Sequence, residues 1–174
     1  MIRKTLPVLI GTLLSSTLAF ADVSLEIKGL NGALEDNVDA YLSAIPEEEY
    51  SVSLRFQSRL ESMIKEALNA LGYYHPHITF THSEDDAEMT VMVEPGEPIV
   101  VYTSDIVLTG EAKDDPDFLA LIAKSKLSKG SILNHGSYDS LKSSIRNLGL
   151  AKGYFDGAYD LSKLEVAPEL NRAY

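Results

Sequence analysis

The sequence contains an internal repeat with an offset of 81 residues. The aligned pairs are Gly29 with Gly110, Leu60 with Leu141, Ser62 with Ser143, Ile64 with Ile145, Lys65 with Arg146, Ala70 with Ala151 and Gly72 with Gly153. In both copies two aromatic residues follow the second glycine: Tyr73 and Tyr74, then Tyr154 and Phe155. A period longer than the roughly 20 to 50 residues of solenoids indicates two tandem small domains. The alternative is chance similarity between two amphipathic helices, which the shared Gly-aromatic-aromatic pattern disfavours.

The first 21 residues have the pattern of a secretory signal peptide. Arg3 and Lys4 form a short positive region, and the stretch 6–20 that follows is mainly apolar. Ala19 and Ala21 give the small-x-small motif that signal peptidase recognises. A membrane anchor is the alternative, but this apolar stretch is shorter than the about 20 residues that span a bilayer. We therefore expect cleavage after Ala21 and export to a bacterial periplasm.

The first repeat predicts a domain over residues 22–97 in the order strand, helix, helix, strand, strand. Residues 23–28 alternate apolar and polar, as do residues 77–81, which is typical of strands with one buried face. Apolar residues recur at helical spacing over 34–45 and again over 56–71. Residues 89–93 are almost continuously apolar, which predicts a central strand buried on both faces. This order indicates an α+β fold with two helices on one face of a three-stranded sheet.

The second repeat predicts a similar domain over residues 98–174, after a Pro- and Gly-rich linker at 94–98. We expect a strand at 100–109, helices at 117–123 and 138–150, and a strand after Gly153. The counterpart of the central strand would begin only near Leu170, close to the last residue, Tyr174. The second domain is therefore predicted to lack its last strand and to be unstable alone, and the chain to be an N-terminal fragment.

Composition excludes several classes of function. The chain has 15 Lys and Arg against 26 Asp and Glu, a formal net charge of −11, which disfavours binding to nucleic acid or anionic lipid. There is no cysteine, so disulfides, thiolate zinc sites and cysteine nucleophiles are excluded. The acidic runs are interpreted as solvated turns and helix starts, each of which could steer a basic partner.

Two patterns could carry chemistry, and both are weak. His75, His77 and His82 lie near the acidic run 84–86, which would suit a metal-dependent hydrolase, but the repeat does not preserve them. Ser62 and Lys65 match the S-x-x-K spacing of a serine nucleophile, but they lie on the polar side of an amphipathic helix without a partner. We therefore expect no catalytic residues, no metal site and no cofactor.

The strand over 77–81 offers a different kind of site. A three-stranded sheet with 89–93 in its middle leaves this strand at an edge, where unpaired backbone groups can accept an incoming strand. The candidate partner-binding residues are His77, Ile78, Thr79, Phe80 and Thr81. Thr79→Pro should then remove an edge donor and weaken binding. The alternatives are that His77 and His82 protect the edge from pairing with another strand, or that the neighbouring domain covers it.

The repeat units resemble POTRA domains. The segments that carry the resemblance are 25–30, 67–74, 93–98 and 151–156, and in this order they are similar to the N-terminal region of the outer-membrane subunits of the translocation and assembly module. The resemblance implies a periplasmic arm that helps to assemble autotransporters and other outer-membrane proteins. It further implies an inner-membrane-anchored TamB-like partner, possible contacts with unfolded substrates, no enzymatic activity, and a membrane β-barrel absent from this chain. A related POTRA-bearing transporter or division protein is the alternative. The resemblance also suggests that Gly72, Tyr73, Tyr74, Gly153, Tyr154 and Phe155 are packing residues.

Overall fold

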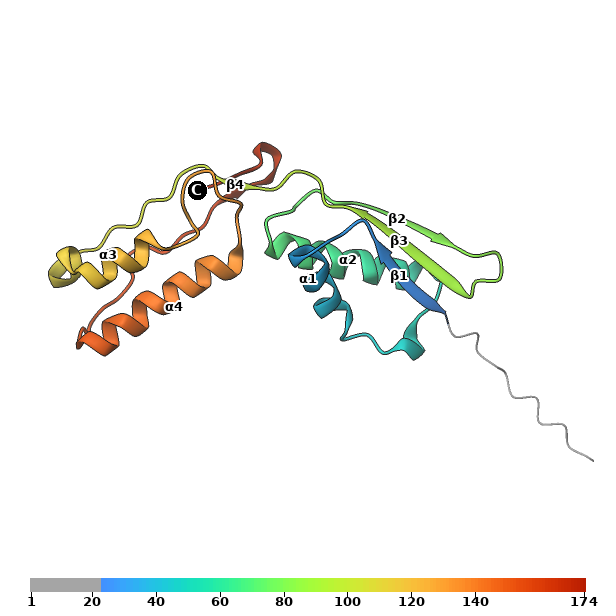
Figure 1. The fold of residues 1–174 in the computed structure, drawn as a ribbon, viewed down its shortest axis with the longest axis horizontal. Coiled ribbons are helices and arrows are strands. Elements are labelled where there is room, and N and C mark those ends of the chain that lie inside the picture. Colours follow the sequence, from blue (N-terminus) through green and yellow to red (C-terminus); the bar gives the residue numbers. More distant parts are fainter. Residues whose placement is uncertain (1–22) are drawn as a thin grey trace, which may run out of the picture.

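The computed structural model describes residues 23–174. The predicted signal peptide and its cleavage motif lie outside the described residues. Residues 23–174 form two α+β units that follow one another along the chain and meet at a bend (Figure 1). Both units have three strands and two α-helices, so the tandem organisation predicted from the repeat is present in the structure.

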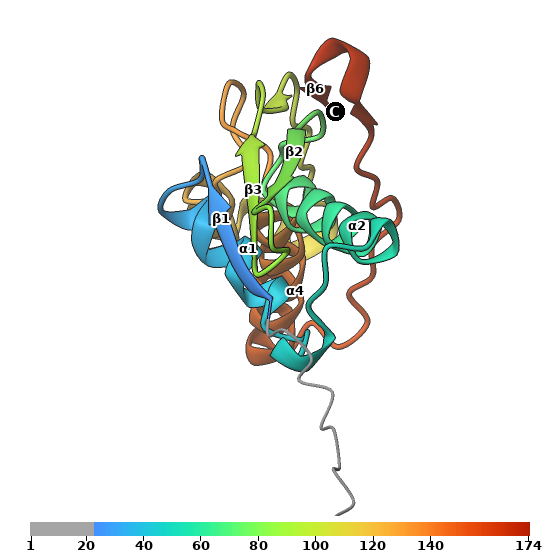
Figure 2. The same cartoon turned by 90° about the vertical axis from the view of Figure 1, so that its right-hand side faces the viewer.

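The first unit has the predicted order of elements. They are β1 (Ser24–Lys28), α1 (Ala33–Leu42), the 3₁₀ turn η1 (Glu47–Glu49), α2 (Leu54–Ala70), β2 (His77–His82) and β3 (Glu88–Glu94). The strand order is β1-β3-β2, with β3 parallel to β1 and antiparallel to β2. Ser53 caps α2, because its hydroxyl accepts a hydrogen bond from the Phe56 N–H at 3.4 Å. Both helices pack on the same face of the sheet (Figure 2).

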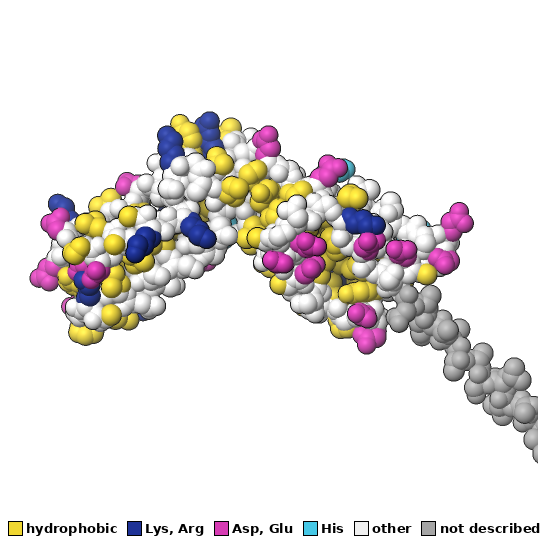
Figure 3. All heavy atoms as spheres, viewed as in Figure 1, with side chains coloured by type: hydrophobic (Ala, Val, Ile, Leu, Met, Phe, Trp, Pro, Cys, Tyr) yellow, Lys and Arg dark blue, Asp and Glu magenta, His cyan; other side chains and the backbone are white. Residues whose placement is uncertain are grey.

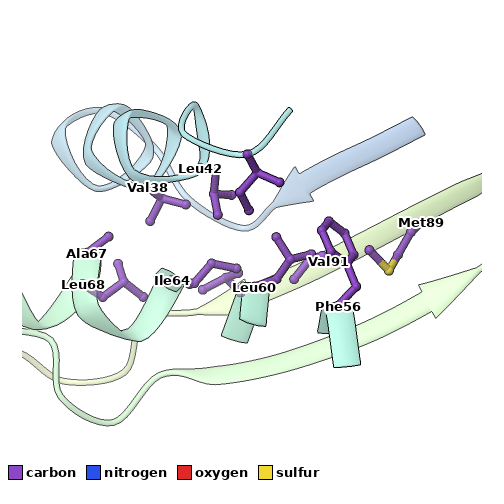
Figure 4. Close-up of a cluster of buried hydrophobic side chains, with 11 residues drawn as sticks. Val38, Leu42, Phe56, Leu60, Ile64, Ala67, Leu68, Met89 and Val91 are labelled. Carbon is purple, nitrogen blue, oxygen red and sulfur yellow. The ribbon is translucent and has the colours of Figure 1, made fainter. Parts of the chain in front are cut away.

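The core of the first unit lies between the helices and the sheet. Side chains from α1, α2 and β3 point toward one another in Figure 4, and they include Val38, Leu60, Ile64, Leu68, Met89 and Val91. These six side chains have no solvent exposure. Each large aliphatic side chain buried in this way contributes about 1.5–3 kcal/mol to folding. The periodic apolar stripe of α2 supplies five of the seven buried residues that the two helices contribute to this core.

The central strand β3 differs from the sequence prediction in one respect. It lies in the middle of the sheet as expected, but it is buried on only one face. Met89, Val91 and Val93 are fully buried, whereas Met92 on the opposite face is 43% exposed. The reason is that the helices cover one face only, so the apolar run 89–93 does not require a second layer.

The second unit repeats this topology with much shorter strands. Its elements are β4 (Val100–Val101), η2 (Gly110–Asp114), α3 (Pro116–Ala123), α4 (His135–Lys152), β5 (Val166–Ala167), η3 (Pro168–Leu170) and β6 (Arg172–Ala173). The order is β4-β6-β5, with β6 parallel to β4 and antiparallel to β5. The last strand is thus present as two residues in the central position, where the prediction had it missing.

One strand prediction in the second unit was too long: the strand expected at 100–109 ends at Val101. The strand expected after Gly153 is present as β5, which begins at Val166. Backbone pairing extends only as far as β6 does: Tyr102 N–H donates to Ala173 at 2.8 Å, and Glu165 and Tyr174 exchange hydrogen bonds at 3.0 and 2.8 Å. An apolar alternation does not form a strand without a neighbour to pair with.

The shorter sheet leaves the helices of the second unit less covered. Five residues of α2 are buried, whereas Leu141 is the buried residue of α4. The segment 154–165 lies along α4 instead. The Tyr159 hydroxyl donates a hydrogen bond to the Lys142 carbonyl at 2.6 Å, and the Tyr138 and Ser162 hydroxyls are hydrogen-bonded at 2.9 Å. The same repeated helix sequence is therefore a core helix in one unit and a half-exposed helix in the other. Among residues 23–174, none of the helices combines the length and apolarity that a bilayer span requires.

Candidate functional site

The edge strand β2 contains all five residues that the sequence analysis singled out. His77, Ile78, Thr79, Phe80 and Thr81 pair on one side with β3, in register from His77 opposite Glu94 to His82 opposite Met89. Within residues 23–174 no strand pairs with the other side of β2. The expected edge is therefore present, and the second unit does not pair with it.

The hydrogen-bond pattern determines which backbone groups of β2 point outward. At the hairpin, the Ser83 N–H donates to the Glu88 carbonyl at 2.9 Å, so this pair is a hydrogen-bonded one. Such pairs alternate along an antiparallel ladder. Odd-numbered residues of β2 therefore bond to β3, and Ile78, Phe80 and His82 direct their N–H and C=O groups outward.

This alternation corrects the expectation about Thr79→Pro. Thr79 lies directly opposite Met92 in a hydrogen-bonded pair, so its N–H belongs to the ladder with β3 and not to the free edge. Proline at this position would break the sheet. Sequence analysis identified the edge strand but could not assign the parity of its hydrogen bonds, because parity depends on the register of the hairpin.

The side chains of β2 divide between two faces. Ile78 and Phe80 are half-buried against the core, whereas His77, Thr79 and Thr81 are exposed on the open face of the sheet. Among these exposed side chains there is no Lys, Arg, Asp or Glu. Charged side chains on an edge strand discourage pairing with another chain, so the absence of these four residue types from the open face of β2 leaves its edge available.

The strand β1 forms the opposite edge and has a different character. Glu26 and Lys28 project from its exposed face and form an ion pair of 2.7 Å. The hydrogen bond to Glu26 raises the pKa of Lys28, so this lysine stays positively charged at neutral pH. Sequence analysis did not consider this second edge, although the two charges in the strand pattern were a usable signal. Between the two edges, β2 is the better acceptor for an incoming strand.

The three histidines considered as metal ligands contact different groups. His75 Nε2 lies 3.1 Å from the Pro168 carbonyl, and His82 Nδ1 lies 2.7 Å from Asp86. His77 Nε2 lies 3.5 Å from the Thr79 hydroxyl. Among residues 23–174, no group of three or more His, Asp or Glu side chains is placed to hold a metal ion.

The S-x-x-K pattern on α2 does not bring its two members together. Lys65 Nζ donates to Glu61 at 2.5 Å, one turn away on the exposed side of the helix. Ser62 is exposed on the same helix. The pattern is therefore part of a solvated helix face, as the amphipathic spacing suggested.

Acidic side chains dominate the surface of the first unit. Between residues 23 and 97 the sequence has four Lys and Arg against fifteen Asp and Glu, whereas the remainder to 174 has nine against ten. Figure 3 shows carboxylates spread over the first unit and both signs over the second. In the β2–β3 hairpin, the Ser83 hydroxyl donates to Asp85 at 2.6 Å and lowers the pKa of that carboxyl. The edge strand thus ends in a turn that stays negatively charged.

The first Gly-aromatic-aromatic motif lies where the two units meet. Tyr73 packs on the core of the first unit, whereas Tyr74 packs on the Ile99, Leu133 and Ala173 cluster of the second. The Tyr74 hydroxyl lies 2.7 Å from His135 Nε2. Burial raises the pKa of Tyr74, so the hydroxyl remains protonated at neutral pH. The two neighbouring tyrosines therefore pack against the cores of different units.

The second copy of the motif packs only in part. Gly153 ends α4 in the left-handed conformation, and Tyr154 contacts Phe118 edge-to-face, with ring centroids 6.0 Å apart. Phe155 is 77% exposed, so the expectation that it is a packing residue is wrong within this structure. Its counterpart Tyr74 packs against the following unit, whereas within residues 23–174 no following unit covers Phe155.

The order strand, helix, helix, strand, strand, with the last strand in the middle of the sheet, is the mixed α+β fold of POTRA domains, as predicted. Residues 24–95 match the family model described as "POTRA domain TamA domain 1". The match covers the first unit from β1 to the end of β3. The first unit is therefore similar to a POTRA domain in sequence as well as in topology.

The chain is also similar, at low sequence identity, to solved structures of BamA and Omp85. The crystal structure of Haemophilus influenzae BamA POTRA3-5 is 15% identical with a TM-score of 0.41, covering 90% of this chain and 59% of that one. BamA from Haemophilus ducreyi lacking POTRA domains 1-3 is 16% identical with a TM-score of 0.42, covering 84% and 26%. POTRA1-2 of Omp85 from Anabaena is 15% identical with a TM-score of 0.39, covering 88% and 90%. The chain thus spans less than two thirds of the first two structures.

Proposed function

We propose that this chain is the exported, periplasmic docking arm of an outer-membrane protein assembly factor, and that it acts by binding rather than by catalysis. The proposal places it at the periplasmic face of the outer membrane. Its partner would be an inner-membrane-anchored TamB-like protein, with unfolded outer-membrane proteins such as autotransporters as possible substrates. Two observations support it: the match of residues 24–95 to a POTRA domain model, and the free edge of β2.

The observation that carries the binding mechanism is the geometry of β2. Ile78, Phe80 and His82 present outward N–H and C=O groups at every second residue, which is the spacing an added strand requires. Main-chain hydrogen bonds would supply the affinity in this mode, and alternate side chains would supply the specificity. Half of the side chains of an added strand would continue the apolar layer begun by Ile78 and Phe80.

The charge of the first unit favours one kind of partner. An excess of carboxylates over this unit attracts a basic segment and repels an acidic one, which accelerates encounter with the right partner. Since these charges are exposed, their contribution should decrease as the ionic strength rises. We therefore expect the strand that binds β2 to come from a basic region of the partner.

Hydrogen exchange of individual amides tests this mechanism directly. The free chain is labelled with ¹⁵N, and exchange is followed by NMR before and after addition of the periplasmic part of a TamB-like protein. In the free chain, Thr79 and Thr81 should already be protected by β3, whereas Ile78, Phe80 and His82 should exchange rapidly. Strand addition should protect these outward amides and leave the inward ones as they were.

The edge strand β1 provides the matched control. Its outward amides are those of Leu25 and Ile27, because the Ser24 N–H donates to the Ala87 carbonyl at 2.9 Å and alternate residues follow it. They should remain unprotected when the partner binds β2. Protection of Leu25 and Ile27 with no change at Ile78 and Phe80 would refute the assignment of the site. Binding without new protection at either edge would refute strand addition itself.

A further inference from the structure

The two units are connected by backbone hydrogen bonds as well as by the chain. The Ile99 N–H donates to the carbonyl of Gly72 at 2.7 Å, and the Leu133 N–H donates to the carbonyl of Ile99 at 2.8 Å. The end of α2, the linker and the loop before α4 therefore form one continuous hydrogen-bonded path. Gly72, Ile99 and Leu133 are all buried, so water does not compete for these bonds.

Gly72 lies directly against the backbone of the second unit. It adopts a left-handed backbone with φ +92°, and a Cβ at this position would lie 2.3 Å from the Leu133 carbonyl oxygen. No side chain fits at that distance, because the obstacle is backbone and cannot rotate away. Gly153 is the equivalent residue of the repeat, with φ +89°, but a Cβ there would meet nothing within 4 Å. The two glycines share a conformation and differ in what packs on them.

Side chains add three contacts around this point. The Tyr74 hydroxyl lies 2.7 Å from His135 Nε2 at the start of α4, and His75 Nε2 lies 3.1 Å from the Pro168 carbonyl. On the linker, Glu97 accepts a hydrogen bond from Asn171 at 3.2 Å. These partners belong to two separate segments of the second unit, the start of α4 and the turn between β5 and β6. Contacts that spread over more than one segment resist rotation about any single axis.

We propose that these contacts fix the relative orientation of the two units, so that they form one rigid arm, and that Gly72 determines the angle of the bend between them. Figure 1 shows that the linker and the end of α2 are the places where the units meet. Rotation about the linker alone would break the Gly72–Ile99 and Tyr74–His135 hydrogen bonds together. This rigidity is a property of the chain itself, and it does not depend on which partner binds β2.

Distance measurements between two spin labels test this rigidity. The chain has no cysteine, so Ser62→Cys and Ser143→Cys introduce two unique labelling sites. Both serines are exposed, and they occupy equivalent positions on α2 and α4. Pulsed electron–electron double resonance on this labelled chain should give a single narrow distribution of distances between the two spin labels.

Two glycine variants of the labelled chain distinguish the effect of the contact between the units from the effect of local backbone strain. Gly72→Ala and Gly153→Ala force an alanine into the same left-handed conformation, so the local strain of each is similar. Gly72→Ala should shift the distribution and widen it, because the second unit must move away from the added Cβ. Gly153→Ala should leave it unchanged. Equal effects of the two variants, or a broad distribution in the parent chain, would overturn the proposal.

A milder pair of variants covers the case in which Gly72→Ala fails to fold. Tyr74→Phe removes only the hydroxyl that contacts His135, and Tyr73→Phe makes the same change on the neighbouring ring that packs on the first unit. Circular dichroism should show that both variants fold. Tyr74→Phe should broaden the distance distribution and Tyr73→Phe should not. If neither variant changes it, or both change it alike, the Tyr74–His135 contact does not hold the angle.

Discussion

Ile64 and Ile145 occupy equivalent positions of the repeat but differ in their surroundings. Ile64 on α2 has no solvent exposure and packs within the core formed by α1, α2 and β3. Ile145 on α4 is only half-buried, because the sheet of the second unit is two residues long on each strand. Replacing each by alanine therefore tests whether equivalent positions of the repeat contribute differently to the free energy of unfolding of the two units.

The expected costs follow from the burial of each side chain. Isoleucine to alanine removes three carbon groups, worth about 2.4 kcal/mol at about 0.8 kcal/mol per buried group. At Ile64 the cavity left behind adds to this, so the total should be about 3–4 kcal/mol. At Ile145 about half of the transfer term applies and solvent fills the gap, which gives about 1 kcal/mol. The gain in helix propensity from alanine is the same at both sites and cancels.

Native-state hydrogen exchange measures the two costs separately in one chain. The slowest amides of α2 and α4 report the opening free energy of their own units. Ile64→Ala should accelerate exchange in α2 by a factor of about 150 or more, since 1.4 kcal/mol corresponds to a factor of ten. Ile145→Ala should accelerate exchange in α4 by a factor of about five. Similar factors for the two variants would refute the conclusion that α4 is less covered than α2.

Two further predictions follow from single contacts. Thr79→Pro should destabilise the first unit by about 3 kcal/mol, because it removes a ladder hydrogen bond opposite Met92, whereas His82→Pro, whose N–H points outward, should cost less than about 1 kcal/mol. Urea unfolding monitored by circular dichroism compares them, and the reverse order would show that the hydrogen-bond parity is wrong. The hydrogen bonds from Lys152, at 2.7 and 2.8 Å, lower the pKa of Asp115. The stability from this pair should therefore be complete above the unfolded-state pKa of about 3.9 and be lost as the pH falls through the lower folded-state value. An NMR titration in which Lys152→Met leaves the Asp115 pKa unchanged would contradict this.

The first unit could be predicted from sequence almost completely. Its helices and strands follow local periodicity, and the structure places β1, α1, α2, β2 and β3 close to the expected ranges. The error concerned β3, where the apolar run 89–93 suggested two buried faces and the structure buries one. A run of apolar residues reports the composition of a strand, whereas the number of layers that cover it depends on the rest of the fold.

The candidate site could be predicted only in outline. The position of β2 at an edge followed from the central place of β3, since a three-stranded sheet has two edges. The assignment of outward groups to Ile78, Phe80 and His82 required the register of the hairpin. The competing edge at β1 followed from the same argument, but the ion pair between its Glu26 and Lys28 side chains is seen only in the structure.

The repeat, the helix periods and the charge distribution are properties of the sequence by itself, because none of them depends on which distant residues come into contact. They determined the tandem organisation, the α+β fold and the acidic character of the first unit. The tertiary structure decided how long the strands of the second unit are, and it decided that Tyr73 and Tyr74 serve different units. Strand pairing and domain contacts join residues that are far apart in sequence. Their geometry therefore exists only in the folded chain.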